Sequence, residues 1–366
     1  MSVSEDAPLL SVRDLVVEFA SRGKQLRAIR NIELDIYAGE TLAIVGESGS
    51  GKSVLTKTFN GMLEANGCIV SGSLSYRGEA LPTDTKSKDW EKIRGKEIAT
   101  VFQDPMTSLN PVRTIGAQIT EVITKHQGMN PRDAKKLAIE LMERTGITNA
   151  KKRFDQYPFE FSGGMRQRIV ITIALACRPR LLICDEPTTA LDVTIQAQIL
   201  DLIKSLQQEY GFTTVYITHD LGVVAAVADR VAVMYSGQIV EYGTVEDIFY
   251  DPRHPYTWSL LSSLPQLGVP GEMLYSIPGT PPSLFGEITG DAFAPRNPFA
   301  MQIDFEDAPE ATWVTEDHYA RTWLLDPRAP KVEPPDAVRN LRSRLTELSN
   351  ASKAAEVNFG LEQAEE

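Results

Sequence analysis

A glycine-rich segment at residues 46–53 carries groups that can hold phosphate. It reads Gly-Glu-Ser-Gly-Ser-Gly-Lys-Ser and matches the P-loop pattern G-x-x-x-x-G-K-[ST], with a strand expected over 41–45 before it and a helix over 54–62 after it. Glycines let successive backbone N–H groups turn inward around phosphate oxygens, and the helix N-terminus adds favourable partial charge. The expected phosphate-binding residues are Gly46, Glu47, Ser48, Gly49, Ser50, Gly51, Lys52 and Ser53.

Two residues of this segment have distinct expected roles. The Lys52 ammonium would reach the β- and γ-phosphates of a nucleoside triphosphate. The Ser53 hydroxyl would ligate a Mg²⁺ ion that bridges the same phosphates. A flexible glycine loop without a ligand is the alternative when such a pattern stands alone.

Two adjacent carboxylates, Asp185 and Glu186, follow a continuous apolar run over 181–184. If the run is a buried strand, both lie at its carboxyl end, where open α/β sheets bind ligands. Asp185 suits a Mg²⁺ contact, and Glu186 is placed to polarise the water that attacks the γ-phosphorus. Two solvated acids at a strand end are the alternative, which the P-loop in the same chain disfavours.

A second glycine pair lies at residues 161–168, which read Phe-Ser-Gly-Gly-Met-Arg-Gln-Arg and resemble the LSGGQ signature of ABC ATPases. Phe161 and Met165 differ from that consensus. The matching positions are Ser162, Gly163 and Gly164. They open an expected helix, so their hydroxyl and N–H groups form a second phosphate-binding terminus. The resemblance implies that two such domains pair head to tail, each signature closing on the nucleotide held by the other subunit's P-loop.

Four further residues fall where this resemblance places functional groups. Gln103 matches the Q-loop, which ties Mg²⁺ and the attacking water to a helical subdomain. His219 matches the H-loop, whose imidazole holds the γ-phosphate. Asp192 matches the D-loop at the dimer interface, and Phe19 matches the aromatic residue that stacks on adenine. The alternatives are a structural glutamine, a structural histidine and a core phenylalanine.

Strands expected over 41–45, 181–184 and 213–218 alternate with helices, including one over about 195–208, and this order predicts an α/β fold with a parallel sheet. The resemblance implies a P-loop ABC nucleotide-binding domain over 1–251, with a RecA-like parallel sheet core. It also implies an N-terminal antiparallel β subdomain, for which the pattern over 10–36 predicts a hairpin, and an inserted helical subdomain over about 105–160. We expect a loop-rich C-terminal extension over 252–334, then a C-terminal helix and polar tail over 335–366.

Composition excludes several classes of protein. The 366 residues carry a formal net charge of −12, which argues against a generic binder of nucleic acid or anionic membranes. No apolar run approaches the roughly 20 residues needed to cross a bilayer, and the N-terminus lacks the features of a signal peptide. Three cysteines in no metal-ligand spacing fit a reducing cytosol. Cys177 and Cys184 lie in apolar runs and are expected in the core.

Residues 254–257 (His-Pro-Tyr-Thr) and 278–284 (Pro-Gly-Thr-Pro-Pro-Ser-Leu) resemble the C-terminal extension of oligopeptide and dipeptide importers. The resemblance implies an ATP-hydrolysing subunit on the cytoplasmic face of the cell membrane, using ATP and Mg²⁺. It implies as partners a second ATPase subunit of different sequence, two transmembrane permease subunits and an extracytoplasmic peptide-binding protein, and no nucleic acid. The alternatives are a soluble non-transport ABC ATPase, an importer of another small solute such as nickel, and an ATP-binding scaffold with a dead site.

Many proteins of that branch carry four cysteines in this extension that resemble an iron–sulfur site. The aligned positions of this chain hold Asp291, Asn297, Asp304 and Thr322. Iron–sulfur clusters need soft thiolate ligands, so we expect no cluster. We expect polar surface residues at these positions. A hard-cation site built from Asp291, Asp304 and His318 is the alternative.

Overall fold

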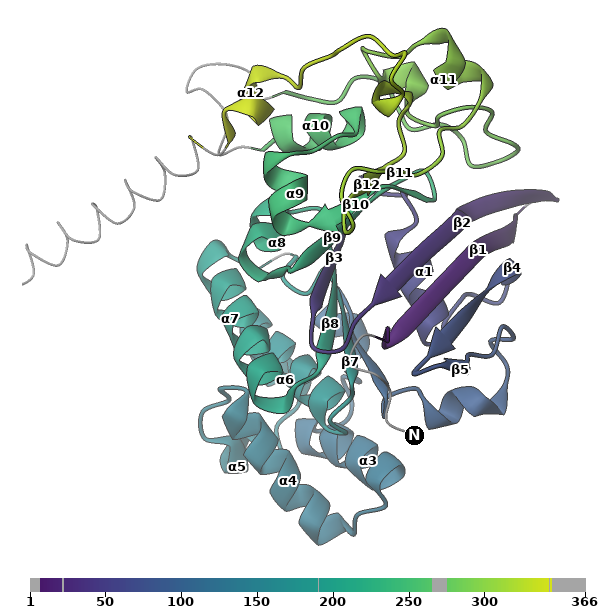
Figure 1. The fold of residues 1–366 in the computed structure, drawn as a ribbon. Helices are drawn as coiled ribbons and strands as arrows, with labels where there is room; N and C mark the ends of the chain where they lie inside the picture. The colour runs from purple at the N-terminus through teal and green to yellow at the C-terminus, as the bar shows by residue number, and fades with distance from the viewer. Residues whose placement is uncertain (1–6, 22, 190, 265–274, 342, 344–366) are drawn as a thin grey trace, which may run out of the picture. The chain divides into compact units, whose positions relative to one another are not determined.

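The computed structural model describes residues 7–21, 23–189, 191–264, 275–341 and 343 (Figure 1). By its internal contacts the chain divides into two compact units. The first comprises residues 1–239 and 284–286, and the second comprises residues 240–283 and 287–366. The boundaries expected after residues 251 and 334 stay predictions.

The first unit begins with an antiparallel sheet in the strand order β2-β1-β4-β5. β1 (Leu10–Ser21) and β2 (Lys24–Ile36) form the hairpin predicted over 10–36. β4 (Gly67–Tyr76) pairs with β1, and β5 (Glu79–Ala80) pairs with β4. Apolar side chains of β1 and β2 are buried beside exposed polar ones, as expected for strands with one covered face.

A parallel sheet in the strand order β9-β3-β8-β7-β6 forms the core of the first unit. Its strands are β3 (Thr41–Val45), β6 (Ile98–Val101), β7 (Leu181–Asp185), β8 (Thr213–Thr218) and β9 (Arg230–Tyr235). β3 and β8 are buried along their whole length, and β3 is continuously apolar after its first residue, as expected for a strand covered on both faces. The strands predicted over 41–45, 181–184 and 213–218 are confirmed.

Helices connect these strands. They are α1 (Lys52–Phe59), α6 (Gly163–Leu175), α7 (Val193–Tyr210), α8 (Leu221–Val227) and the 3₁₀ helix η1 (Lys88–Lys92). α1 ends at Phe59, before the predicted residue 62, because Gly61 takes the left-handed conformation with φ 65°. α7 is longer than the predicted span over 195–208, since the Asp192 side chain caps its start and Gly211 ends it.

The region over 105–160 is mostly helical, as predicted. It contains α2 (Pro105–Ser108), α3 (Ile115–Gln127), α4 (Pro131–Arg144), α5 (Ala150–Arg153) and the 3₁₀ helix η2 (Pro158–Glu160). Figure 1 shows α3, α4 and α5 gathered together. Thr114 and Asn130 cap the starts of α3 and α4 with their side-chain oxygens. The buried faces of α3, α4 and α6 share one apolar cluster.

The second unit consists of short elements joined by loops. β10 (Gln238–Thr244), which leads into it, pairs antiparallel with β12 (Tyr319–Ala320), and β12 pairs with β11 (Thr312–Trp313). The helices are α9 (Val245–Tyr250), α10 (Pro255–Ser262), α11 (Gln302–Glu306), α12 (Asp336–Arg339), η4 (Ala294–Arg296) and η5 (Trp323–Leu325). Most of the predicted C-terminal helix and tail lies outside the described residues.

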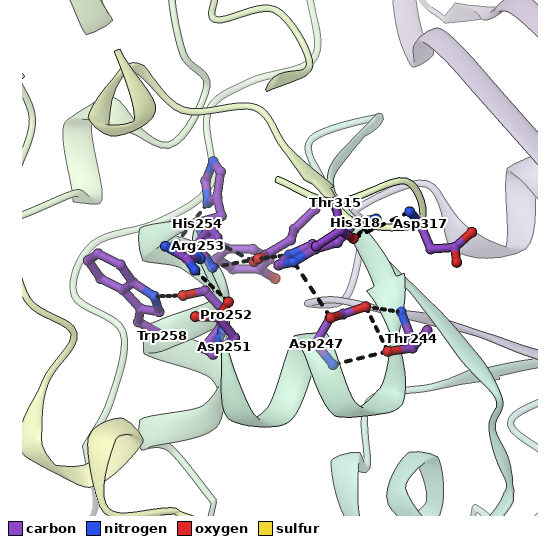
Figure 2. A network of polar contacts seen from close by, with 12 residues as sticks. Thr244, Asp247, Asp251, Pro252, Arg253, His254, Trp258, Thr315, Asp317 and His318 are labelled. Atoms are coloured by element: carbon purple, nitrogen blue, oxygen red, sulfur yellow. Dashed lines mark hydrogen bonds and ion pairs between the residues drawn. The ribbon is translucent and has the colours of Figure 1, made fainter. Parts of the chain in front are cut away.

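A buried polar network links three parts of the second unit. The Glu241 carboxylate in β10 is fully buried and accepts hydrogen bonds from the backbone N–H groups of Arg253 (2.5 Å) and His254 (3.1 Å). Its Oε1 also lies 2.9 Å from Nε2 of the fully buried His318. Figure 2 shows Arg253, His254 and His318 of this network together with Asp247. Asp247 Oδ1 lies 4.0 Å from His318 Nδ1. Because Glu241 is fully paired, its burial is compatible with a stable fold.

The positions aligned with the four cysteines are buried, so the prediction of polar surface residues was wrong. They are Asp291, Asn297, Asp304 and Thr322. Each side-chain oxygen accepts a hydrogen bond from a backbone N–H group two or three residues away, of Phe293, Phe299, Met301 and Leu324 respectively. Short polar side chains can be buried in this way because they satisfy the backbone of their own turns. Within the described ranges, no three His, Cys, Asp or Glu residues are grouped to hold a metal ion.

The cysteines are free thiols in different surroundings. Cys184 in β7 is fully buried, as expected of a core residue, and Cys68 is exposed. Cys177 is only half-buried, so its assignment to the core was partly wrong; burial nevertheless raises the pKa of its thiol. Among the helices of the described part of the chain, none is both long and apolar enough to cross a membrane.

Candidate active site

The predicted functional side chains follow the carboxyl ends of parallel strands. The P-loop follows β3, Gln103 follows β6, Glu186 follows β7 and His219 follows β8. The strand ends are in register, with Val45 paired to Thr218 and Asp185 paired to Ile217. Parallel pairing therefore brings groups that are distant in sequence to one edge of the sheet.

The P-loop between β3 and α1 depends on glycine at two positions. Gly46 and Gly51 have φ values of 148° and 104°, which side chains rarely adopt. A Cβ atom at Gly46 would overlap the Met234 carbonyl oxygen, and one at Gly51 would lie 2.8 Å from the Ala28 carbonyl oxygen. The loop therefore keeps its close-packed form only without side chains there.

The Lys52 ammonium lies inside the loop. Its Nζ donates to the carbonyl oxygens of Gly46 (2.8 Å) and Glu47 (2.9 Å), and the residue is 7% exposed. Burial lowers the pKa of this ammonium, although nearby carboxylates oppose the shift. The Ser50 hydroxyl is buried without a partner in the described part of the chain. A buried cation and an unpaired hydroxyl fit an anionic ligand such as phosphate.

Ser53 and Asp185 meet at the start of α1. The Ser53 hydroxyl donates a hydrogen bond of 3.2 Å to Asp185 Oδ1. Burial raises the pKa of Asp185, while the Ser53 hydrogen bond acts in the opposite direction. A hydroxyl oxygen and a carboxylate oxygen are hard ligands of the type that Mg²⁺ prefers. The pair therefore fits the predicted Mg²⁺ site.

The Glu186 carboxylate is the meeting point of three donors. Its Oε2 lies 3.0 Å from Gln103 Nε2 and 2.9 Å from Thr189 Oγ1, and its Oε1 lies 3.2 Å from His219 Nδ1. The structure thus brings all three predicted catalytic residues together. Sequence reasoning missed Thr189; a hydroxyl residue three positions after Glu186 in a turn was the available signal.

The signature residues start α6. The Ser162 side chain caps the helix by accepting a 3.4 Å hydrogen bond from Met165 N–H, and both Ser162 and Gly163 are exposed. Gly164 packs against α7, where a Cβ would lie 2.7 Å from Ile195 Cγ2. Asp192, the predicted D-loop residue, caps α7 by accepting from the Ile195 N–H group at 3.0 Å. The polar groups of this helix start are therefore open to a ligand.

Phe19 lies in the antiparallel sheet of the first unit. It pairs with Leu26 of β2 and with Gly67 of β4, and it is half-buried. A Cβ at Gly67 would lie 2.5 Å from Phe19 Cε1, so the ring covers that glycine. The contact of Phe19 with adenine stays a prediction.

Comparison with known proteins agrees with these features. Residues 29–189 match the ABC transporter family, and residues 240–303 match the oligopeptide/dipeptide transporter C-terminal region. The oligopeptide transport ATP-binding protein AmiE of Streptococcus pneumoniae is 66% identical over 339 residues, covering 93% of this chain and 96% of that protein. The oligopeptide transport ATP-binding protein OppD of Bacillus subtilis is 55% identical, covering 93% of this chain and 95% of that protein.

A solved structure shares the fold. The dimeric ATP-binding cassette MJ0796, in a post-hydrolysis state bound to ADP and Pi, matches with a TM-score of 0.57 and 27% identity. The match covers 64% of this chain and 98% of that one. The predicted ABC nucleotide-binding fold is confirmed, and with the extension matched over its own family region, the chain belongs to the family of ATP-binding proteins of oligopeptide and dipeptide ABC transporters.

Proposed function

We propose that this chain is the ATP-hydrolysing subunit of a membrane importer and that it powers the uptake of peptides. Its relatives named for oligopeptide and dipeptide transport align along nearly the whole chain, extension included. The observation that carries the proposal is the convergence of Gln103 and His219 on Glu186, at the sheet edge that also holds the Ser53–Asp185 pair.

The first step is to hold the triphosphate. The P-loop N–H groups and Lys52 bind the β- and γ-phosphates, and Lys52 exchanges its two carbonyl partners for phosphate oxygens. Ser53, Asp185 and Gln103 would hold Mg²⁺, which would neutralise charge on the transferring phosphate. Burial raises the pKa of Asp185, and a bound cation would act in the opposite direction.

The second step is to activate water. Glu186 accepts hydrogen-bond donors at both oxygens, so it can polarise a water that replaces one of them. His219 is exposed, with 63% of its side chain accessible, and can turn from Glu186 to the γ-phosphate. Gln103 is exposed as well and can turn toward Mg²⁺.

The third step is to complete the site across a dimer. The exposed groups at the start of α6 close on a nucleotide held by a second ATPase subunit, with Asp192 beside that interface. The residues of this half-site are Ser162, Gly163 and Gly164. Phe19 supplies a stacking face for adenine. ATP thus drives closure, and hydrolysis allows the pair to reopen.

The partners are a second ATPase subunit of different sequence, two permease subunits and an extracytoplasmic peptide-binding protein, with the chain on the cytoplasmic face of the membrane. An apolar groove of about 240 Å³ in the first unit suits a permease segment. Its lining includes Ile98 of β6, Val122 of α3 and Ile173 of α6, together with Leu109 just after α2. Phe102 also lines the groove and is adjacent to Gln103, which contacts the Glu186 carboxylate. A permease segment bound in the groove can therefore influence that carboxylate through Gln103.

The test compares the wild-type protein with Glu186→Gln. The variant keeps the size of the side chain and removes the carboxylate, so we expect ATP binding to persist while ATP turnover and peptide uptake are lost. Uptake of nickel instead of peptide would assign another solute. Undiminished hydrolysis by the Glu186→Gln variant would overturn the proposed function.

A further inference from the structure

Thr189 makes a contact that none of the sequence motifs assigns. Its hydroxyl donates a hydrogen bond of 2.9 Å to Glu186 Oε2. Its backbone N–H also donates to the Glu186 carbonyl oxygen at 3.2 Å. The same residue therefore holds both the main chain and the side chain of Glu186.

Glu186 needs such support because of its backbone conformation. Its φ of 46° lies in the left-handed region, which non-glycine residues seldom adopt. Conformations of this kind persist where surrounding contacts determine them, and they gather at active sites. Its N–H donates to the Ile217 carbonyl of β8 at 2.9 Å, so the strand fixes one side of the residue and the Thr189 turn fixes the other.

The three donors to the Glu186 carboxylate differ in exposure and in the part of the chain that carries them. Gln103 and His219 are exposed, and each follows a different strand of the sheet. Under the proposed function both turn toward the phosphates and Mg²⁺ when ATP binds. Thr189 is half-buried and lies in the same short turn as Glu186, so its hydrogen bond does not depend on those loops.

We propose that Thr189 is a positioning residue for ATP hydrolysis, holding the Glu186 carboxylate in the orientation that polarises the attacking water. The inference rests on the role of Glu186 in the proposed function. With Oε2 bound to the Thr189 hydroxyl, Oε1 is the oxygen left for water once His219 turns away. Loss of the hydroxyl leaves the carboxylate free to rotate, which lowers the fraction of time spent in a reactive geometry.

The experiment uses two substitutions of Thr189. Each is made in the full-length chain and measured in the purified transporter assembly. Thr189→Val keeps the shape and removes the hydroxyl, whereas Thr189→Ser keeps the hydroxyl and removes a methyl group. We expect Thr189→Val to lower kcat for ATP by about tenfold with KM unchanged. We expect Thr189→Ser to keep kcat within about twofold of the wild type.

Three results would overturn the inference. The first is an unchanged kcat in Thr189→Val. The second is an equal loss of kcat in Thr189→Val and Thr189→Ser. The third is a loss of kcat/KM in Thr189→Val that comes from a raised KM. Glu186→Gln measured in parallel separates this inference from the proposed function. If Glu186→Gln is inactive and Thr189→Val is fully active, only the role of Thr189 fails; if Glu186→Gln keeps turnover, both fail.

Discussion

The Ser53 hydroxyl lies 3.2 Å from Asp185 Oδ1, although the two residues are 132 positions apart in the chain. β8 lies between β3 and β7 in the sheet, so the loops after β3 and β7 end at the same edge. The contact joins the two oxygens that the sequence assigns to Mg²⁺. The two oxygens of the proposed metal site therefore lie side by side in this structure.

Ser53→Ala tests this metal site. The substitution removes one hard oxygen ligand, so we expect ATP turnover at limiting Mg²⁺ to fall by about tenfold and to recover partly at high Mg²⁺. Titration of turnover against Mg²⁺ measures the change. Ser205→Ala, at an exposed position of α7, is the control and should match the wild type. A Mg²⁺ dependence identical in Ser53→Ala and wild type would refute the assignment.

His254 predicts a pH dependence of stability. The residue is fully buried and its Nδ1 accepts from Tyr256 N–H, and burial lowers its pKa to about 3. The unfolded chain, with a histidine pKa of about 6.5, binds this proton more readily. The stabilisation is therefore complete above about pH 6.5 and is lost as the pH falls toward the folded value, by about 1 kcal/mol between pH 6.5 and 5.5.

His254→Asn isolates that effect. Asparagine keeps an oxygen that can accept from Tyr256 N–H but does not titrate. We expect urea unfolding of the full-length variant to show a weaker loss of stability between pH 6.5 and 5.5 than the wild type. The comparison uses the difference between the two pH values, because the smaller side chain also lowers stability at both. Equal pH dependence in the two proteins would contradict the prediction.

Glu241 predicts a large stability difference between two substitutions. Glu241→Ala leaves His318 and the N–H groups of Arg253 and His254 without their buried acceptor, so we expect a loss of about 3–5 kcal/mol. Glu241→Gln keeps the size and one oxygen acceptor and should lose less. Urea unfolding of both variants measures the difference. Alanine and glutamine variants of equal stability would show that the network contributes nothing.

Many importer proteins carry cysteine at four positions of the extension where this chain does not. This absence predicts the optical properties of the purified protein. We expect no charge-transfer absorption at about 400 nm and no stoichiometric iron, because thiolate ligation is required. The oxygens of Asp291, Asn297, Asp304 and Thr322 already accept backbone hydrogen bonds. Absorption spectra and iron analysis of protein purified without oxygen make the measurement. One or more iron atoms per chain would contradict it.

Much of the first unit could be predicted from sequence because its signals are local. Continuous apolar runs indicated β3 and β7, the β-branched and aromatic residues over 213–218 indicated β8, and the P-loop pattern located the turn after β3. β6 has four residues and β9 begins with a charged arginine, so neither run was distinctive enough to predict. The start of α7 was missed by two residues because the Asp192 cap was assigned only to the dimer interface.

Other features depend on contacts that a sequence pattern does not contain. The Thr189 hydrogen bond forms in a turn where Glu186 has a left-handed backbone, which composition does not reveal. Burial of Asp304 requires a loop whose N–H group points at its carboxylate, so polarity alone suggested the surface. The Glu241–His318 pair joins residues 77 positions apart, and no motif links them.

Light scattering on the Glu186→Gln protein tests the central claim most directly. The full-length chain is measured alone and with a co-expressed second ATPase subunit, in Mg²⁺–ATP and in Mg²⁺–ADP. If each signature closes on the nucleotide of the other subunit, the ATPase chains pair in ATP and separate in ADP. At least one of the two preparations then has the mass of two ATPase chains in Mg²⁺–ATP and of one chain in Mg²⁺–ADP. The same mass in both nucleotides, in both preparations, would contradict the account.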